Sequence, residues 1–181
     1  MKFHSLSLPG LVLIKPEIPT DHRGLFVKHY HRELFLKNGI DFVPKEEFYS
    51  VSRVGVLRGM HFQVPPADHG KLVHCVRGRV HDVVLDLRKG SPTYGQAWHG
   101  QLDDVTCEAI YLPPGLAHGS YSLDPDTIVS YSVSSTHAPG HDRGIRWDGF
   151  GHAWPCKDPI ISERDKGHPS LAEFETPFTY P

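Results

Sequence analysis

Residues 71–87 are Lys71-Leu72-Val73-His74-Cys75-Val76-Arg77-Gly78-Arg79-Val80-His81-Asp82-Val83-Val84-Leu85-Asp86-Leu87. Two short apolar segments rich in β-branched residues, 73–76 and 80–87, lie on either side of the turn residues Arg77-Gly78. Such segments fit a pleated sheet, and a glycine between them favours a turn. This run therefore predicts two successive strands.

The same pattern continues along the chain. Further strand candidates span residues 109–112, 119–123 and 127–133, and turn residues such as Pro113-Pro114-Gly115 and Asp124-Pro125-Asp126 separate them. Helical signal is limited to residues 31–37, before Asn38-Gly39, and to a turn that begins at Ser162. No GxGxxG run or strand-helix alternation indicates a doubly wound nucleotide fold. The sequence predicts an all-β sandwich or barrel with short peripheral helices.

Size and composition restrict the class of protein. A chain of 181 residues suits one domain, which we expect to span residues 1–181. A formal net charge of -2 argues against nucleic acid as a partner. The apolar stretch Leu11-Val12-Leu13-Ile14 is too short for a signal peptide or a membrane span. Three widely spaced cysteines are expected to be reduced, and together these features favour a cytoplasmic protein without a membrane partner.

His61 is the first candidate for chemistry. In an extended segment it shares a face with Gly59 and Gln63, while Met60 and Phe62 point the other way. A face of glycine, histidine and glutamine is polar, so it fits the wall of a cavity better than a packed core. A structural, hydrogen-bonded histidine explains the same pattern equally well.

Two further polar side chains occur within apolar strands. Lys71 shares a face with Val73, where an ammonium group is costly unless it meets an anion or extends to solvent. Tyr131 shares a face with Val129 and Val133, so its hydroxyl needs a partner. Tyr131 is therefore either a core residue or a proton donor at a cavity.

The run Pro113-Pro114-Gly115-Leu116-Ala117-His118 resembles the second conserved motif of cupins, which are jelly rolls. Metal-binding cupins carry H-x-H and then a glutamate in the first motif. The matching places here hold His61-Phe62-Gln63 and Lys71. An ammonium group cannot ligate a metal and repels one, so the resemblance implies a cupin cavity that uses no metal.

A fuller resemblance, to the dTDP-4-dehydrorhamnose 3,5-epimerase family, extends from Asp21-His22-Arg23-Gly24-Leu25-Phe26 to Ser162-Glu163-Arg164-Asp165. It includes residues 56–63, 70–73, 82–88, 91–95 and 144–147. The resemblance implies a cupin-type double-stranded jelly roll and a homodimer. It also implies epimerisation of the carbons that flank the 4-keto group of a nucleotide-diphosphate sugar, without a cofactor.

The resemblance assigns four catalytic roles. His61 matches the base that removes a proton alpha to the ketone, and Asp165 matches its carboxylate partner. Lys71 lies near the developing enolate oxygen, and Tyr131 is the acid on the opposite face of the sugar. For Asp165 the local pattern leaves an alternative, because Ser162-Glu163-Arg164-Asp165 also matches a helix capping box.

Further residues are assigned to substrate binding. Arg23 and Arg58 match arginines that contact the diphosphate, and Phe26 matches an aromatic residue near the nucleotide. Because the N-terminal strand crosses to the partner in this family, Arg23 and Phe26 are expected to serve the neighbouring subunit. The remaining expected substrate contacts are Gln63, His118, Asp142 and Arg164.

The sequence departs from the family pattern at three places. Lys28 replaces a glutamate, the run around Phe48 replaces a Q-D-N-H-S-like segment, and His137 replaces a tyrosine before Ala138-Pro139. Phe48 and His137 are expected at the substrate. These changes leave open which nucleotide and sugar are used, and whether C3, C5 or both are inverted.

Three other functions fit parts of the pattern. A metal-dependent cupin enzyme would use His61, His74 and His118 as ligands. A binding protein would hold the sugar nucleotide without turnover, which does not require a poised base and acid. A nucleotide-sugar 3,4-ketoisomerase would move the carbonyl group rather than invert a carbon.

Overall fold

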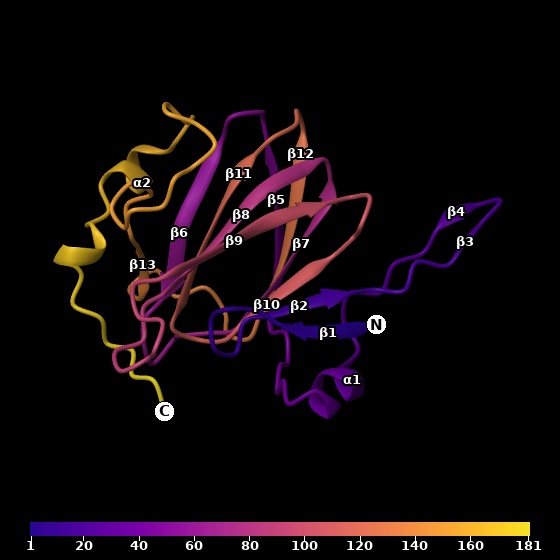
Figure 1. Ribbon diagram of the computed structural model, residues 1–181, viewed down its shortest axis with the longest axis horizontal. Helices are drawn as coiled ribbons and strands as arrows, with labels where there is room; N and C mark the ends of the chain where they lie inside the picture. Colours follow the sequence, from indigo (N-terminus) through magenta and orange to yellow (C-terminus); the bar gives the residue numbers. More distant parts are fainter.

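Two antiparallel sheets lie face to face in the computed structural model, which describes all 181 residues (Figure 1). The order of the six-stranded sheet is β1-β2-β10-β7-β12-β5, and that of the five-stranded sheet is β13-β6-β11-β8-β9. Strands that are neighbours in a sheet are mostly distant in sequence, as in a jelly roll with Greek-key connections. The predicted fold class, a cupin-type jelly roll with short peripheral helices, is confirmed.

The strands of the six-stranded sheet are β1 (Lys2–Ser5), β2 (Val12–Lys15), β5 (Glu46–Ser52), β7 (Lys71–Arg77), β10 (Ala109–Leu112) and β12 (Thr127–Val133). Those of the five-stranded sheet are β6 (Leu57–Gln63), β8 (Arg79–Asp86), β9 (Ala97–Asp103), β11 (Leu116–Ser122) and β13 (Asp142–Gly144). The predicted strands at 109–112 and 127–133 match β10 and β12. The strand predicted at 119–123 begins earlier, because Leu116 already pairs with Asp86 of β8.

The main core fills the space between the sheets. Val73, Val84, Ile110 and Val129 are among its fully or almost fully buried members, and they come from both sheets. Val83 and Leu85 of β8 point the other way and are also buried, under Ile145, Trp154 and Phe178 from the C-terminal segment. The five-stranded sheet is therefore covered on both faces over this region, which explains the continuous apolar run in residues 83–85.

Three small elements lie around the two sheets: α1 (Arg32–Lys37), α2 (Glu163–Lys166) and the 3-10 helix η1 (Leu171–Glu173). As predicted, α1 ends at Asn38-Gly39, where Gly39 has a φ of 76° that suits a left-handed cap. Phe35 of α1 packs with Phe42 and Ile14 on the outer side of the six-stranded sheet. None of these helices has both the length and the apolar character that a membrane-crossing helix requires.

The strands β3 (Thr20–Asp21) and β4 (Gly24–Leu25) form a separate hairpin that projects from the body of the molecule (Figure 1). Leu25 and Phe26 are 60% and 62% exposed. The three cysteines are free, which agrees with the expectation that they form no disulfide framework.

Candidate active site

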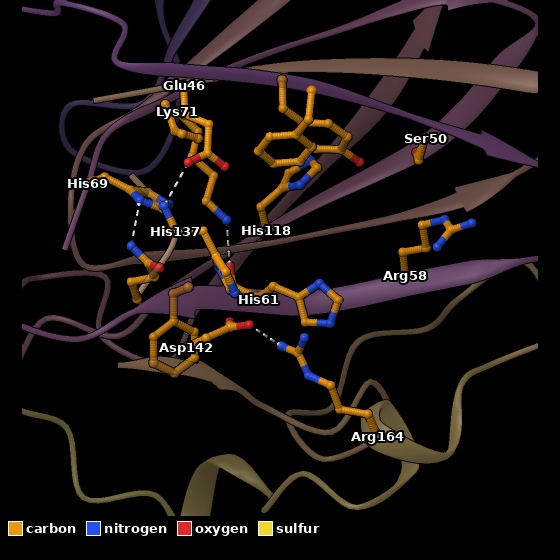
Figure 2. A pocket seen from close by; sticks show the side chains of 15 residues that line it. Glu46, Ser50, Arg58, His61, His69, Lys71, His118, His137, Asp142 and Arg164 are labelled. Carbon is orange, nitrogen blue, oxygen red and sulfur yellow. Dashed lines mark hydrogen bonds and ion pairs between the residues drawn. The ribbon is translucent and has the colours of Figure 1, made fainter. Parts of the chain in front are cut away.

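A cavity of about 340 Å³ opens between the two sheets (Figure 2). Ten of the residues expected at the site line it: Phe48, Arg58, His61, Gln63, Lys71, His118, Tyr131, His137, Asp142 and Arg164. It also has five lining residues that the sequence did not single out for the site: Glu46, Ser50, Phe62, His69 and Val133. The sheets thus bring together side chains that lie more than a hundred positions apart in the sequence.

A bulge in β6 sets the direction of the side chains on this strand. His61 pairs with His118 and Arg58 with Ser120, so Gly59 and Met60 together oppose the single residue Gly119. A side chain at position 59 would place its Cβ 2.4 Å from the Cα of Gly119, and the φ of Gly59 is 140°. Only glycine fits there. The bulge lets Arg58 line the cavity together with His61, which strict alternation does not allow.

His61 is paired with Asp165. Its Nε2 lies 2.8 Å from Asp165 Oδ1, and Asp165 Oδ2 also accepts a hydrogen bond of 3.4 Å from the Gly59 amide. Burial acts to raise the pKa of the Asp165 carboxyl, but these contacts with His61 and Gly59 outweigh it and hold the pKa below its usual value. An ionised carboxylate can only accept, so Nε2 carries the proton and the lone pair of His61 is on Nδ1.

The sequence left two roles open for Asp165, as the partner of His61 and as part of a helix capping box, and the structure shows contacts of both kinds. Its backbone amide donates to the Ser162 hydroxyl at 3.1 Å, so Ser162 caps the start of α2 as predicted. The carboxylate is directed to His61 instead of back to the helix start. The side chain itself is only 5% exposed. Thus α2 fixes the backbone of Asp165 while its carboxylate orients His61.

Lys71 does not extend to solvent. The residue is 9% exposed, and its Nζ donates to the backbone carbonyl of His61 at 3.0 Å, from the opposite sheet. Burial lowers the pKa of Lys71 to about 8, and the charge of Asp142 acts in the opposite direction. A buried ammonium group at a cavity wall is suited to stabilise negative charge that develops on a ligand.

Tyr131 lies on β12, in the sheet opposite to His61. Its ring stacks on Phe48, with centroids 5.0 Å apart, and meets His118 edge to face. Burial raises the pKa of the Tyr131 hydroxyl to about 12, and the Ser120 and Ser50 hydroxyls act in the opposite direction. The phenol therefore remains protonated near neutral pH and can donate a proton.

His118 forms a second histidine–carboxylate pair. Its Nε2 is 2.8 Å from Oδ2 of Asp82, and both side chains are almost completely buried. Asp82 was not singled out for the site from the sequence. The sequence did contain a signal for it: Asp82 is a carboxylate within the apolar strand of residues 80–87. A buried charge needs a partner, so this position could have been predicted to pair with another polar side chain.

Polar contacts also fix Gln63 and the loop that carries His137. The Oε1 of Gln63 accepts from the Ala138 amide at 2.6 Å, and its Nε2 donates to the Ala67 carbonyl at 2.8 Å. The His137 amide donates to Glu46 Oε2 at 2.8 Å. Gln63 therefore holds the 67 and 138 loops together at one end of the cavity.

Charged groups surround the cavity mouth. Arg164 forms an ion pair with Asp142 at 2.9 Å, and the Arg58 guanidinium donates to the Ser52 hydroxyl at 3.0 Å. The side chain of Arg164 remains 52% exposed. These guanidinium groups are available to an anionic ligand that enters from solvent.

Arg23 and Phe26 do not line this cavity. They lie on the projecting hairpin, and Arg23 is paired with Asp21. Nothing within the single chain brings them to His61.

The histidines of the metal-dependent alternative do not come together. His61 and His118 are neighbours across β6 and β11, but His74 is not among the cavity residues. His74 stacks on His29 at a centroid distance of 3.7 Å instead. The ligand set proposed for that alternative is therefore not assembled, although all three histidines lie in or near strands.

Comparisons with known proteins agree on one family. The family model described as dTDP-4-dehydrorhamnose 3,5-epimerase matches residues 5–173. The dTDP-4-dehydrorhamnose 3,5-epimerase of Sinorhizobium fredii is 39% identical over 184 residues, which cover 99% of this chain and 94% of the relative.

Two solved structures illustrate the range of similar enzymes. The Legionella pneumophila dTDP-6-deoxy-D-glucose-3,5-epimerase, in complex with dTDP-4-keto-L-rhamnose, has a TM-score of 0.94 at 28% identity, covering 99% of this chain and 98% of that chain. A 3'-monoepimerase from Streptomyces bikiniensis, in complex with dTDP-quinovose, has a TM-score of 0.89 at 36% identity. The match covers 93% of this chain and 87% of that chain.

Proposed function

The chain belongs to the dTDP-4-dehydrorhamnose 3,5-epimerase family, and we propose that it epimerises a dTDP-linked 4-keto-6-deoxyhexose at C3, at C5 or at both. The observation that carries this proposal is the His61–Asp165 pair at 2.8 Å, beside a cavity that also holds Lys71 and Tyr131. Inversion of a carbon next to a ketone requires a base, a group that stabilises the enolate and an acid. His61, Lys71 and Tyr131 are suited to these three roles.

The first step is removal of a proton from the carbon next to the C4 ketone. The Nδ1 lone pair of His61 takes this proton, while Asp165 accepts from Nε2 and stabilises the imidazolium ion that forms. The electron pair of the broken C–H bond moves onto the C4 oxygen and gives an enolate. The Lys71 ammonium group stabilises that negative charge, which is worth about 2.7–4 kcal/mol for a single well-placed donor.

The second step returns a proton to the opposite face of the same carbon. Tyr131 is suited to this because it projects from β12 while His61 projects from β6, in the other sheet. The phenol gives up its proton as the enolate collapses back to the ketone. His61 and Tyr131 then exchange protons with water, which restores both groups for the next turnover.

Binding of the nucleotide diphosphate is assigned to the charged mouth of the cavity and to the hairpin. Arg58 and Arg164 contact the anionic part of the substrate, and Asp142 and Gln63 orient the sugar and its neighbouring loops. We further propose a homodimer in which the β3–β4 hairpin delivers Arg23 and Phe26 to the cavity of the partner. The adjacent exposed side chains of Leu25 and Phe26 support this, since apolar side chains on a projecting hairpin can be buried by contact with a second chain.

Inversion at C3 alone is a second form of the activity. The cavity allows it because His137 lies where the family pattern has a tyrosine, a change that leaves open whether C3, C5 or both are inverted. A monoepimerase is among the similar structures.

Deuterium incorporation tests the activity and its regiochemistry together. The enzyme is incubated in deuterated water with dTDP- and other nucleotide-linked 4-keto-6-deoxyhexoses, and the sugar is followed by NMR. We expect deuterium at C3, at C5 or at both, with inversion at the labelled carbon. A protein that binds these compounds tightly but incorporates no deuterium contradicts the proposed function.

A further inference from the structure

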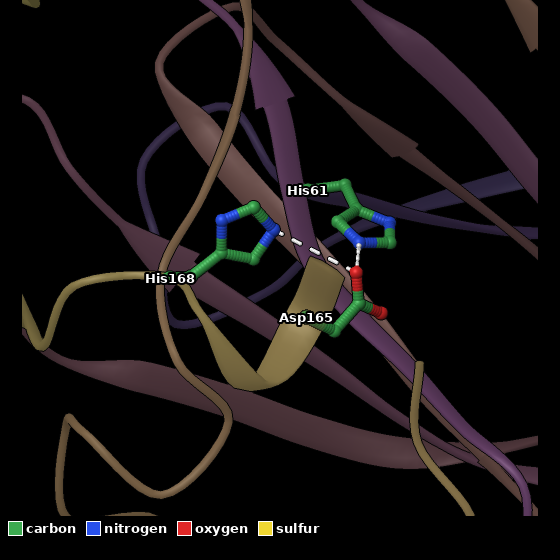
Figure 3. Close-up of side chains that lie close together, drawn as sticks. All are labelled: His61, Asp165 and His168. Carbon is green, nitrogen blue, oxygen red and sulfur yellow. Dashed lines mark hydrogen bonds and ion pairs between the residues drawn. The ribbon is translucent and has the colours of Figure 1, made fainter. Parts of the chain in front are cut away.

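A third side chain of ligand type, His168, lies beside the His61–Asp165 pair (Figure 3). Its Nε2 is 3.6 Å from Asp165 Oδ1, compared with 2.8 Å for His61 Nε2. One ligand atom from each residue lies within 4.8 Å of the other two. His168 does not line the substrate cavity, and the proposed mechanism uses none of its atoms.

The free nitrogen of His168 has no hydrogen-bond partner. Nε2 is buried and makes no hydrogen bond, because its distance of 3.6 Å to Asp165 Oδ1 is too long for one, and the side chain is only 13% exposed. A neutral imidazole carries a lone pair on one ring nitrogen, which can be offered to a metal ion. A buried polar atom without a partner is unfavourable unless something else satisfies it.

We propose that His61, Asp165 and His168 form an inhibitory binding site for a divalent transition-metal ion such as Zn²⁺. Two imidazoles and one carboxylate are a common ligand set for this class of ion. Bond lengths of about 2.0–2.2 Å in tetrahedral geometry separate ligand atoms by about 3.3 Å. The distances from Asp165 Oδ1 to the two imidazole nitrogens, 2.8 and 3.6 Å, lie on either side of that value, and all three ligand atoms lie within 4.8 Å of one another. Binding an ion therefore requires the side chains to move closer around it.

A second cavity reaches two of the three proposed ligands. It is lined by His61, Ser162 and Asp165 among others, and it shares His61, Arg58 and Arg164 with the substrate cavity. Water from this side can complete the coordination shell. The nearby cations Arg164 and Lys71 oppose metal binding, although Arg164 is paired with Asp142, so we expect weaker affinity than at a structural zinc site.

Metal at this position switches off the base without occupying the substrate cavity. The ion binds the Nε2 lone pair of His61, so the Nε2 proton must leave and Nδ1 must take up a proton from solvent. The imidazole stays neutral, but Nδ1, which points away from Asp165 and His168 in Figure 3, then has no lone pair. We therefore expect metal to lower kcat and to leave KM unchanged. This inhibitory effect rests on the proposed function, whereas metal binding itself does not.

Metal binding is measured first, without substrate. Chelator-treated wild type is titrated with ZnCl₂ by calorimetry and with CoCl₂ by visible absorption. His168→Phe and His168→Asn remove the third ligand, and thermal unfolding monitored by circular dichroism shows that each variant folds. We expect both to bind one ion per protomer fewer, or to bind at least about tenfold more weakly. Equal titrations of wild type and both folded variants overturn the proposal.

Inhibition is measured next, as initial rates with increasing ZnCl₂. For wild type we expect kcat to fall, KM to stay constant and EDTA to restore the rate. His168→Phe keeps the metal-free kcat and is resistant at the same Zn²⁺ concentrations. His152→Phe, which breaks the separate His81–His152 contact of 3.0 Å, is the control and should respond as wild type does.

Purely competitive inhibition by Zn²⁺ contradicts a metal site formed by His61, Asp165 and His168. Equal sensitivity of His168→Phe and wild type to Zn²⁺ contradicts it as well. If no nucleotide sugar is turned over at all, the proposed function fails, but the titrations still decide whether the metal site exists.

Discussion

Lys71 links the rate of the reaction to pH. Burial lowers the pKa of Lys71 to about 8, and only the protonated form stabilises the enolate. As the pH rises through this value the ammonium group loses its proton, so kcat should fall. In Lys71→Arg the guanidinium stays charged, so the rate should be lower throughout because the geometry differs, but without this decline. Profiles of kcat against pH for both proteins check the assignment, and an identical decline in Lys71→Arg speaks against it.

Tyr131 is needed for the second step but not for the first. Tyr131→Phe removes the hydroxyl and keeps the ring that stacks on Phe48. We expect turnover to fall by roughly 10²–10⁴-fold, since a positioned acid contributes about that much. Exchange of the abstracted hydrogen with deuterated water should persist, because His61 remains. NMR measures both quantities, and loss of exchange together with turnover would assign Tyr131 to the first step.

The residues of the site differ in how far the sequence alone could reveal them. Lys71 and Tyr131 were predictable because each places a polar group on an apolar strand face, where burial demands a function or a partner. Asp165 had only a local signal for helix capping, and its contact with His61 depends on tertiary folding. The position of His168 beside Asp165 likewise depends on tertiary folding. Most of the roles proposed for the site residues came from the resemblance to a family, not from local sequence patterns.

At the scale of elements, the four-residue helix α2 holds Asp165 in place. Ser162→Ala removes the cap on the Asp165 amide, which costs about 0.5–2 kcal/mol. We expect a lower melting temperature and a lower kcat with little change in KM, because Asp165 orients the base without contacting the substrate. Ser162→Thr keeps a capping hydroxyl and is the matched control. Calorimetry measures the melting temperature of both variants, and steady-state kinetics measures kcat and KM. If Ser162→Ala is destabilised but its kcat is unaltered, the cap does not contribute to catalysis.

Strand boundaries were predictable where turn residues flank an apolar run. β12 matches its prediction because Asp124-Pro125-Asp126 precedes a clear alternation. β5 and β9 were not predicted as strands. Most residues of β5 are exposed or partly exposed, and β9 becomes fully buried only at Leu102 and Asp103, so neither carries a strong apolar pattern. These two strands are specified by pairing with β12 and β8, which is information that local sequence does not contain.

At the scale of the whole molecule, we predict that each active site of the proposed homodimer is completed by the β3–β4 hairpin of the other subunit. His61→Asn lacks the base and Arg23→Glu reverses the charge proposed to serve the partner, so each homodimer should be inactive or nearly so. After the two are mixed and subunits exchange, half of the dimers are mixed, and each has one site with both lesions and one site with neither. About a quarter of wild-type activity should return. Mixing that restores nothing, although mass spectrometry shows subunit exchange, places Arg23 at its own site.

The central claim is that the His61–Asp165 pair removes the proton. Deuterium exchange into a dTDP-4-keto-6-deoxyhexose, compared by NMR between chelator-treated wild type and His61→Asn, tests it most directly. Wild type should exchange the hydrogen next to the ketone at a rate at least equal to turnover. His61→Asn, with an unchanged fold by circular dichroism, should be slower by roughly 10²–10⁴-fold. Exchange at the wild-type rate in His61→Asn contradicts the account.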